Sequence, residues 1–152
     1  MFVFALPWIG WRAVKKAAEP SSSLTILIAD DNRDAVTTLT ELLVAEGHAV
    51  RAAHSGLEAL RADLEHKPQV VILDLRMPDI DGYDVARWLR SRHNKRCPVL
   101  IAISGEYTRP SDREFAQVCG FDHYLTKPYD FRQLVSFLTA PRRQRLTTRS
   151  QG

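Results

Sequence analysis

Three acids, a hydroxyl and a lysine stand directly after runs of apolar residues in this chain. Asp30 and Asp31 follow the first such run, Asp74 follows the third, Ser104 the fourth, and Lys127 the fifth. The carboxyl ends of parallel strands meet at one edge of a doubly wound sheet, and ligands bind there. We therefore expect these five side chains to converge on one site.

The chemistry of such a site is that of a single phosphoryl group. Carboxylates brought together repel one another, so the site needs a cation, and oxygen ligands favour Mg²⁺. With Mg²⁺ and Lys127 neutralising phosphoryl oxygens and Ser104 donating a hydrogen bond, a carboxylate can attack phosphorus in line and form an aspartyl phosphate. Asp74 is the predicted nucleophile because it ends the most apolar run, which would hold it centrally and rigidly.

The first acidic loop argues against a nucleotide site. It reads Ala-Asp-Asp-Asn-Arg at 29–33 and contains no glycine, so it cannot cradle phosphates with its backbone as a glycine-rich loop does. Neither a G-x-G-x-x-G nor a Walker A sequence occurs in the chain. The sequence therefore disfavours binding of a dinucleotide or a nucleoside triphosphate.

An alternation of strands and helices must position the site residues. Strands are expected at 24–29, 48–53, 70–73, 99–103 and 121–125, each followed by apolar residues at helical spacing. In the second helix the apolar face is expected to include Leu57, Leu60 and Leu64, and Phe115 and Val118 mark the fourth helix. Five strand–helix pairs predict an α/β fold, a doubly wound parallel sheet with helices on both faces.

At this point the sequence resembles a known family. Residues 70–82, Val-Val-Ile-Leu-Asp-Leu-Arg-Met-Pro-Asp-Ile-Asp-Gly, are similar to the phosphoacceptor segment of response-regulator receiver domains, the CheY-like family. The acidic pair at 30–31, Ile-Ser-Gly at 103–105 and Leu-Thr-Lys-Pro at 125–128 match its other signatures in order. The resemblance covers residues 24–139 and implies a flavodoxin-like sheet in the order 2-1-3-4-5.

The resemblance implies a role for each acid. Asp74 would accept a phosphoryl group from a histidine kinase or a histidine phosphotransfer protein. Asp31 and Asp74 would bind Mg²⁺ directly, together with the backbone carbonyl of Arg76, and Asp30 would bind it through water. The chain would then be a phosphoacceptor that acquires and loses its own phosphoryl group, and not a conventional enzyme.

The resemblance also implies a switch. Ser104 takes the position of the switch hydroxyl, Tyr124 that of the switch aromatic, and Lys127 would contact the phosphoryl group. The peptide bond between Lys127 and Pro128 is expected to be cis. The departures from the family pattern are a Ser where Thr is frequent and Gly105 where Ala is commoner.

The expected output is protein contact in two-component signal transduction. With no DNA-reading module after residue 139, we expect a single-domain response regulator that contacts a protein target through its fourth helix, fifth strand and fifth helix, and no nucleic acid. Arg113, Gln117 and His123 are candidate contacts there. Alternatives are a phosphorelay intermediate or the receiver of a hybrid histidine kinase. An aspartyl-phosphate phosphatase is less favoured, since it needs a second acid where this chain has Arg76.

The charge pattern separates two tails from the domain. The chain has 152 residues and a net charge of +3. The excess is in residues 140–152, with four arginines and no acid, and in residues 1–23, which leaves 24–139 net negative. We therefore predict an aromatic and basic N-terminal tail and linker at 1–23, one domain at 24–139, and a solvated basic tail at 140–152.

The N-terminal tail has three interpretations. Phe2, Phe4, Trp8 and Trp11 precede Arg12, Lys15 and Lys16. They could form an interfacial membrane anchor, a segment that docks on the domain or a partner, or an extension without a role, which we favour. The order of apolar and basic residues fits a secretory signal poorly, so a cytoplasmic location is expected.

Overall fold

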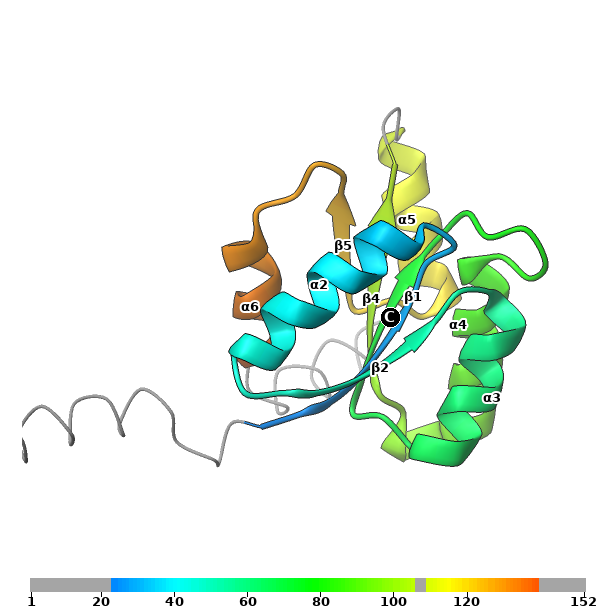
Figure 1. Ribbon diagram of the computed structural model, residues 1–152. Helices are drawn as coiled ribbons and strands as arrows, with labels where there is room; N and C mark the ends of the chain where they lie inside the picture. The colour runs from blue at the N-terminus through cyan, green and yellow to red at the C-terminus, as the bar shows by residue number, and fades with distance from the viewer. Residues whose placement is uncertain (1–22, 106–108, 140–152) are drawn as a thin grey trace, which may run out of the picture.

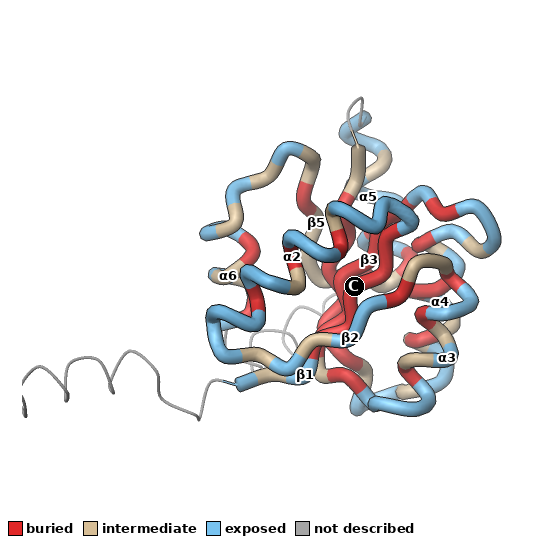
Figure 2. The backbone as a smooth tube through the Cα atoms, viewed as in Figure 1, coloured by how far each residue is buried: buried red, intermediate tan, exposed pale blue. Residues whose placement is uncertain are grey.

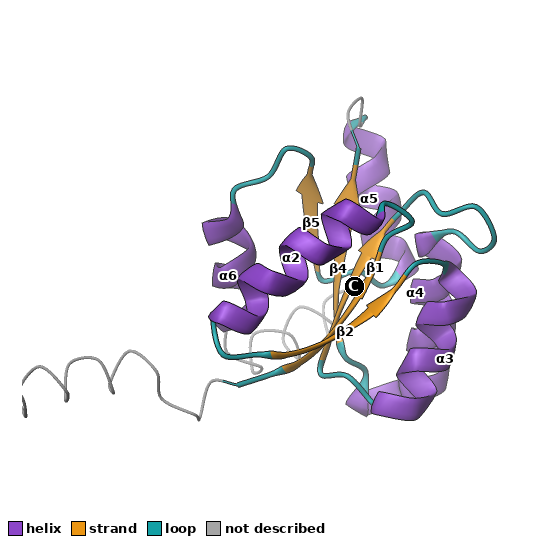
Figure 3. Ribbon diagram, in the orientation of Figure 1, coloured by secondary structure: helices purple, strands orange, loops and turns teal. Residues whose placement is uncertain are grey.

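The computed structural model describes residues 23–105 and 109–139. Strands and helices alternate through these residues (Figures 1 and 3). Apart from Ser23, the two predicted tails lie outside the described residues. The elements are β1 Thr25–Ala29, α2 Arg33–Ala45, β2 Ala49–Ala53, α3 Gly56–His66, β3 Val70–Asp74, α4 Gly82–His93, the 3₁₀ helix η3 Asn94–Arg96, β4 Val99–Ser104, α5 Pro110–Cys119, β5 His123–Thr126 and α6 Phe131–Thr139.

The five strands form one parallel sheet in the order β2-β1-β3-β4-β5. This confirms the predicted fold class and strand order. The order reverses between β1 and β3, so the two strands that carry the acids lie side by side. The register pairs Ala29 with Leu73 and Asp74 with Ile103, which places the ends of β1, β3 and β4 at one edge.

Burial explains why these segments are strands. Every residue of β3 is buried, as is β4 as far as Ile103, whereas β2 at the edge of the sheet is buried only at Ala53 (Figure 2). A strand that lies inside a parallel sheet is covered by helices on both faces and reads as a continuous apolar run. The centre of the sheet therefore supplies a rigid base for the residues that follow it.

Helices cover the two faces unequally (Figure 1). On one face α2 and α6 pack against the sheet through residues such as Leu43 and Leu134, and on the other α3, α4 and α5 pack through Ala59, Leu89 and Ala116. Side chains of a strand alternate between faces, so Ile72 joins the first core and Leu73 the second. Among the described residues, no helix is long and apolar enough to cross a membrane.

Local sequence signals set the helix ends. The side chains of Asn32, Ser55 and Asp81 cap α2, α3 and α4 by accepting hydrogen bonds from backbone N–H groups of the first turn. Gly120 ends α5 with φ of 112°, a left-handed conformation that favours glycine.

Large apolar side chains are exposed on two helices, and in α3 this differs from the predicted face. Leu57 and Leu64 of α3 are 46% and 43% exposed, and Phe115 and Val118 of α5 are 47% and 82% exposed. The buried positions are instead Gly56, Ala59 and Asp63 in α3, and Ala116 and Cys119 in α5. In α3 the prediction was wrong for Leu57 and Leu64 because it counted large apolar residues, whereas close packing favours small ones; Leu60 packs against the core as predicted.

Candidate functional site

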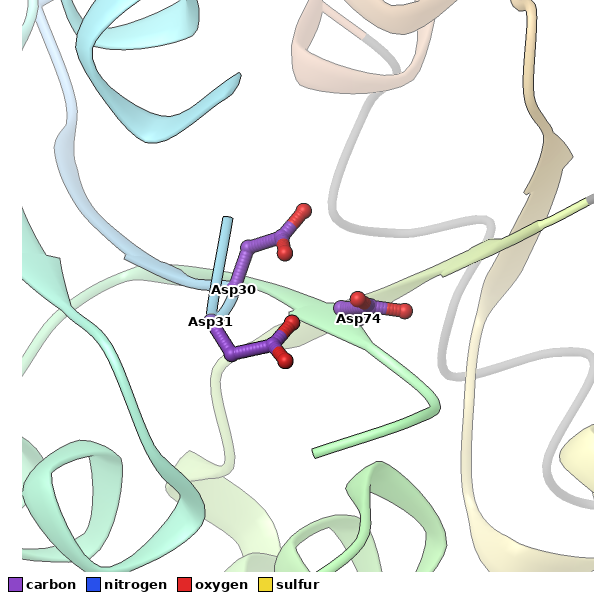
Figure 4. Close-up of side chains that lie close together, drawn as sticks. All are labelled: Asp30, Asp31 and Asp74. Atoms are coloured by element: carbon purple, nitrogen blue, oxygen red, sulfur yellow. The ribbon is translucent and has the colours of Figure 1, made fainter. Parts of the chain in front are cut away.

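Three acids meet at the edge of the sheet where β1 and β3 end. Asp30 and Asp31 lie in the loop after β1, and Asp74 is the last residue of β3 (Figure 4). Each offers a carboxylate oxygen, and these oxygens lie within 4.8 Å of one another. Asp30 and Asp74 are only 6% and 8% exposed, while Asp31 is exposed. The structure therefore brings together the acids that the sequence singled out.

Asp30 is held in its ionised form by its hydrogen-bond partners. Its Oδ1 accepts from the backbone N–H of Asn32 at 2.9 Å, and its Oδ2 accepts from Nζ of Lys127 at 2.9 Å. Burial alone would raise the pKa of Asp30, but these donors outweigh it and the pKa lies below its ordinary value. Asp30 and Lys127 thus form an ion pair inside the site.

For Asp74, the effects that raise the pKa outweigh those that lower it. Its Oδ1 accepts from the backbone N–H of Arg76 at 3.2 Å, but Nζ of Lys127 lies farther off, 3.8 Å from Oδ2. Burial, and then repulsion by the charge of Asp30, raise the pKa of Asp74 to about 6. Among the described residues one ammonium faces three acids, so negative charge at Asp74 is incompletely balanced.

Lys127 is positioned by the backbone on both sides of it. Its N–H donates to the carbonyl of Ser104 at 2.7 Å, which ties the end of β5 to the end of β4. The bond from Lys127 to Pro128, for which the family resemblance implies a cis geometry, is cis. Despite partial burial, contact with Asp30 and then Asp74 raises the pKa of Lys127.

The donor set fits a hard divalent cation. Carboxylate oxygens from the three acids surround one space, and each belongs to a residue fixed at or just after a strand end. Mg²⁺ binds oxygen ligands, retains several waters, and needs only one or two carboxylates from the protein. A cation there would also neutralise the charge that Lys127 leaves unbalanced.

The two predicted switch residues come from β4 and β5. Ser104 ends β4, and its hydroxyl donates to the carbonyl of Gly105 at 3.4 Å. The ring of Tyr124 packs with the α4 and α5 side of the core, and the guanidinium of Arg113 lies 5.5 Å from its ring centroid. The buried Tyr124 hydroxyl has no hydrogen-bond partner among the described residues. The structure therefore gives their positions beside the site, and their role in switching remains a prediction.

The loop after β3 has an anchor that the sequence interpretation missed. Both carboxylate oxygens of Asp79 accept backbone N–H bonds of 2.9 Å, from Gly56 and Leu57 in the first turn of α3. These bonds lower the pKa of Asp79 to about 2. The contact is so close that a Cβ on Gly56 would lie 2.3 Å from the carbonyl oxygen of Ile80. The Met-Pro-Asp sequence indicates a loop, but only the three-dimensional structure shows that Asp79 bonds to α3.

A hollow beside the acids opens between α2 and α6. It has a volume of about 500 Å³, and its walls include Asp30, Asp74 and Lys127 at one end and Leu42 and Phe131 along the helices. The hollow therefore joins the acids to a partly apolar surface beside them.

The comparisons with known proteins agree with this geometry. The family model of the response regulator receiver domain matches residues 26–139. The chain belongs to the response-regulator receiver domain family. Receiver domains of two-component systems are not a conventional enzyme family, and they interact with histidine kinases. Phosphorylation and Mg²⁺ binding in an acidic pocket are general features of the family.

Relatives of this receiver domain occur in longer regulators. The transcriptional regulatory protein PrrA of Mycobacterium bovis is 33% identical over 84% of this chain, and the match covers 53% of PrrA. The chain thus spans about half the length of the curated relatives that it matches.

Solved receiver domains have the same fold. A putative response regulator from Chloroflexus aurantiacus is 31% identical with a TM-score of 0.69, over 76% of this chain and 94% of that one. The receiver domain of a sensor histidine kinase from Pseudomonas aeruginosa is 28% identical with a TM-score of 0.68, over 76% and 94% of the two chains. That structure has a magnesium ion coordinated in its active site cleft.

Proposed function

We propose that this receiver domain is a Mg²⁺-dependent phosphoacceptor and that Asp74 is the residue that becomes phosphorylated. The observation that carries the proposal is the place of Asp74: it ends the most buried strand, faces two further acids, and lies 3.8 Å from the one ammonium of the site. A carboxylate so placed is fixed for in-line attack and is poorly neutralised until a cation and a phosphoryl group arrive.

The transfer step exchanges one bond for another. An oxygen of Asp74 forms a bond to phosphorus as the bond from phosphorus to a partner's histidine nitrogen breaks, and the nitrogen keeps the electron pair. The acids Asp31 and Asp74 and the carbonyl of Arg76 would hold Mg²⁺, with Asp30 contacting it through water. Mg²⁺, when bound, neutralises phosphoryl oxygens, and Lys127 contacts one of them.

The phosphorylated state would act through Ser104 and Tyr124, which belong to β4 and β5. A phosphoryl oxygen near Ser104 would draw its hydroxyl from the Gly105 carbonyl, and Tyr124 would repack under Arg113. The face made by α5, β5 and α6 would change, and it would contact a protein target. Of the candidate contacts, Arg113 and Gln117 are exposed, while His123 stacks on Phe137 with ring centroids 4.1 Å apart.

Phosphorylation from a small donor tests the proposal. The full chain is incubated with acetyl phosphate and Mg²⁺, and intact mass is measured for the wild type, for Asp74→Asn and for Asp84→Asn. Asp84 is an exposed acid of α4 paired with Arg87, so it is a matched control. Addition of one phosphoryl group to the wild type and to Asp84→Asn alone supports the proposal. Modification of Asp74→Asn, or none in the wild type with Mg²⁺, contradicts it.

A second candidate function is that of a phosphorelay intermediate. The similarity to a receiver domain of a sensor histidine kinase favours it, because such a receiver lies within a kinase. The two functions differ in the fate of the phosphoryl group. Transfer from Asp74 to a histidine phosphotransfer domain that is faster than hydrolysis would identify a relay, and slow hydrolysis with a change at the face of α5, β5 and α6 would identify a switch.

A further inference from the structure

A groove lies at the edge of the sheet far from the acids, where β2 meets the ends of α2 and α3. Its volume is about 410 Å³, and its walls include Val44 of α2, Ala49 and Val50 of β2, and Ala62 of α3. Val44 is 53% exposed, although it is a large apolar residue. The groove therefore offers apolar surface that the described part of the domain leaves uncovered.

The strand that lines this groove, β2, has an exposed edge. β2 is the last strand of the sheet and pairs with β1 alone among the described strands, so its outer edge carries backbone groups without a strand partner. Four of its five residues are not buried. Natural sheets cover or charge such an edge, because it otherwise pairs with other chains.

The chain enters the domain at this groove. The N–H of Leu24 donates to Nδ1 of His48 at 3.1 Å, and its carbonyl accepts from the N–H of Ala49 at 2.9 Å. His48 and Ala49 both line the groove, as does the next residue, Thr25. Whatever precedes Leu24 is therefore attached at the rim of the groove.

The segment that precedes Leu24 has the composition to fill the groove. Residues 2–11, Phe-Val-Phe-Ala-Leu-Pro-Trp-Ile-Gly-Trp, contain no charged residue and four aromatic rings. The twelve residues from Arg12 to Ser23 connect it to Leu24. As a flexible chain they would span about 20 Å, and a tether of this kind gives an effective concentration of about a millimolar.

Charge at the rim is compatible with the linker. The linker carries Arg12, Lys15 and Lys16. The groove's own basic residues are Arg51, His48 and His66. Glu46 is exposed and lies two residues before His48 in the chain, and the exposed Glu65 carboxylate lies 3.6 Å from the His66 ring. These exposed acids offer partners for the basic linker.

We propose that the N-terminal segment of residues 2–11 docks intramolecularly in the groove between β2 and the ends of α2 and α3. It covers the open edge of the sheet and the apolar surface around Val44. The inference does not depend on the proposed phosphorylation, because the groove lies at the other end of the sheet from Asp74.

Tryptophan fluorescence tests the docking in the full chain. Trp8, Trp11 and Trp88 are the three tryptophans, so in a Trp88→Phe chain the emission reports residues 2–11 alone. Quenching by acrylamide is then compared between this chain and one that also carries Val44→Asp and Ala49→Glu, both at exposed groove positions. The matched control carries Gln117→Glu and Val118→Asp, on the exposed face of α5.

We expect the tail tryptophans to be protected, quenching to rise severalfold in the groove variant, and no change in the control. Protection must be independent of protein concentration. Hydrogen exchange of the β2 amides should rise when Trp8 and Trp11 are replaced by Ser, while exchange in α5 stays the same, a readout independent of the groove substitutions.

Four results would overturn the proposal. These are unprotected tryptophans in the folded full chain, protection that the groove variant retains, protection that grows with concentration and so comes from a second copy, and protection that requires phosphatidylglycerol vesicles and so comes from a membrane surface. Circular dichroism of each variant establishes that it is folded before the comparison is made.

Discussion

Two groups of charged residues in this receiver domain are balanced in different ways. At the acidic edge, three carboxylates face one ammonium in the described part of the chain, that of Lys127, and the pKa of Asp74 rises to about 6. Near the start of β4, the carboxylate of Asp122 accepts hydrogen bonds from the guanidinium of Arg90 at 2.7 Å and from the N–H of Leu100 at 2.9 Å. Arg90 also donates to the carbonyl of Gly120 at 2.7 Å.

The difference separates a site from a structural clamp. The Arg90–Asp122 pair is one-to-one, each partner has a further backbone hydrogen bond, and together they tie α4 to the turn after α5 and to β4. The acidic edge keeps excess negative charge, which costs stability and leaves room for a cation. Four substitutions can break or sharpen this comparison.

The largest effect is expected from the clamp. Arg90→Ala leaves Asp122 partly buried without its cation and removes the donor to the Gly120 carbonyl. We expect a loss of about 3 kcal/mol in the free energy of unfolding, measured by urea denaturation. A loss as small as that of an exposed pair would mean that the clamp is not a stabilising element.

The second largest effect is a gain in stability, expected from replacing Asp74. The folded-state pKa of Asp74, about 6, exceeds the ordinary value of 3.8, so between these values the folded chain binds a proton that the unfolded chain does not. Asp74 therefore lowers stability progressively as pH rises from about 4 to about 6, and the cost is complete above that range. Without Mg²⁺, Asp74→Asn should stabilise the domain by roughly 1–3 kcal/mol at neutral pH.

This gain should vanish near pH 4, where the carboxyl is protonated in the folded chain. Thermal denaturation of the wild type and of Asp74→Asn across this pH range checks it. Equal stabilities at neutral pH would mean that Asp74 is already compensated, and the contrast with Asp122 would fail. Added Mg²⁺ should stabilise the wild type more than Asp74→Asn if it binds as proposed.

A smaller effect is expected at the anchor of the β3–α4 loop. Asp79→Ala removes the acceptor for the N–H groups of Gly56 and Leu57 and frees the loop that contains Arg76. We expect a modest drop in melting temperature and a severalfold weaker affinity for Mg²⁺ by titration calorimetry. Asp79→Asn, which keeps one acceptor oxygen, should recover part of both; unchanged Mg²⁺ affinity in Asp79→Ala would show that the loop does not position the site.

The smallest effect is expected at an exposed pair. Arg87 lies 3.1 Å from Asp84 across one turn of α4, and both side chains are more than half exposed. Arg87→Ala should change the free energy of unfolding by about 0.3 kcal/mol, because solvent screens such a pair. The same denaturation assay gives the reference against which Arg90→Ala is judged, and a loss comparable to that variant would remove the distinction.

Much of the fold follows from local pattern. The apolar runs that became β1, β3 and β4 are recognisable because buried parallel strands tolerate few polar residues, and Ser55 and Gly120 mark helix ends by their own chemistry. The boundary of β5 was less predictable: Phe121 was expected in the strand, but it is a buried residue that precedes the first paired position, His123.

Helix faces and long-range pairs were beyond local reasoning. Gly56 lies against Ile80 of the β3–α4 loop and Ala116 packs in the core, because these helices approach their neighbours closely, at a distance that no single helix encodes. Asp63 of α3 is 1% exposed and lies 2.6 Å from the ring of His93 at the end of α4. From the sequence alone, an acidic residue in a helix is expected to face solvent, because its partner on another helix is not known.

The sequence by itself determined an α/β fold with acids, a hydroxyl and a lysine at strand ends, because hydrophobic period and residue type are local properties. The receiver family was indicated by the resemblance of its motifs to those of known receiver domains. Only the tertiary structure decided how charge is shared. Lys127 lies nearer to Asp30 than to Asp74, Asp79 bonds to α3, and Arg90 reaches Asp122, because each distance depends on how elements far apart in the chain pack on one sheet.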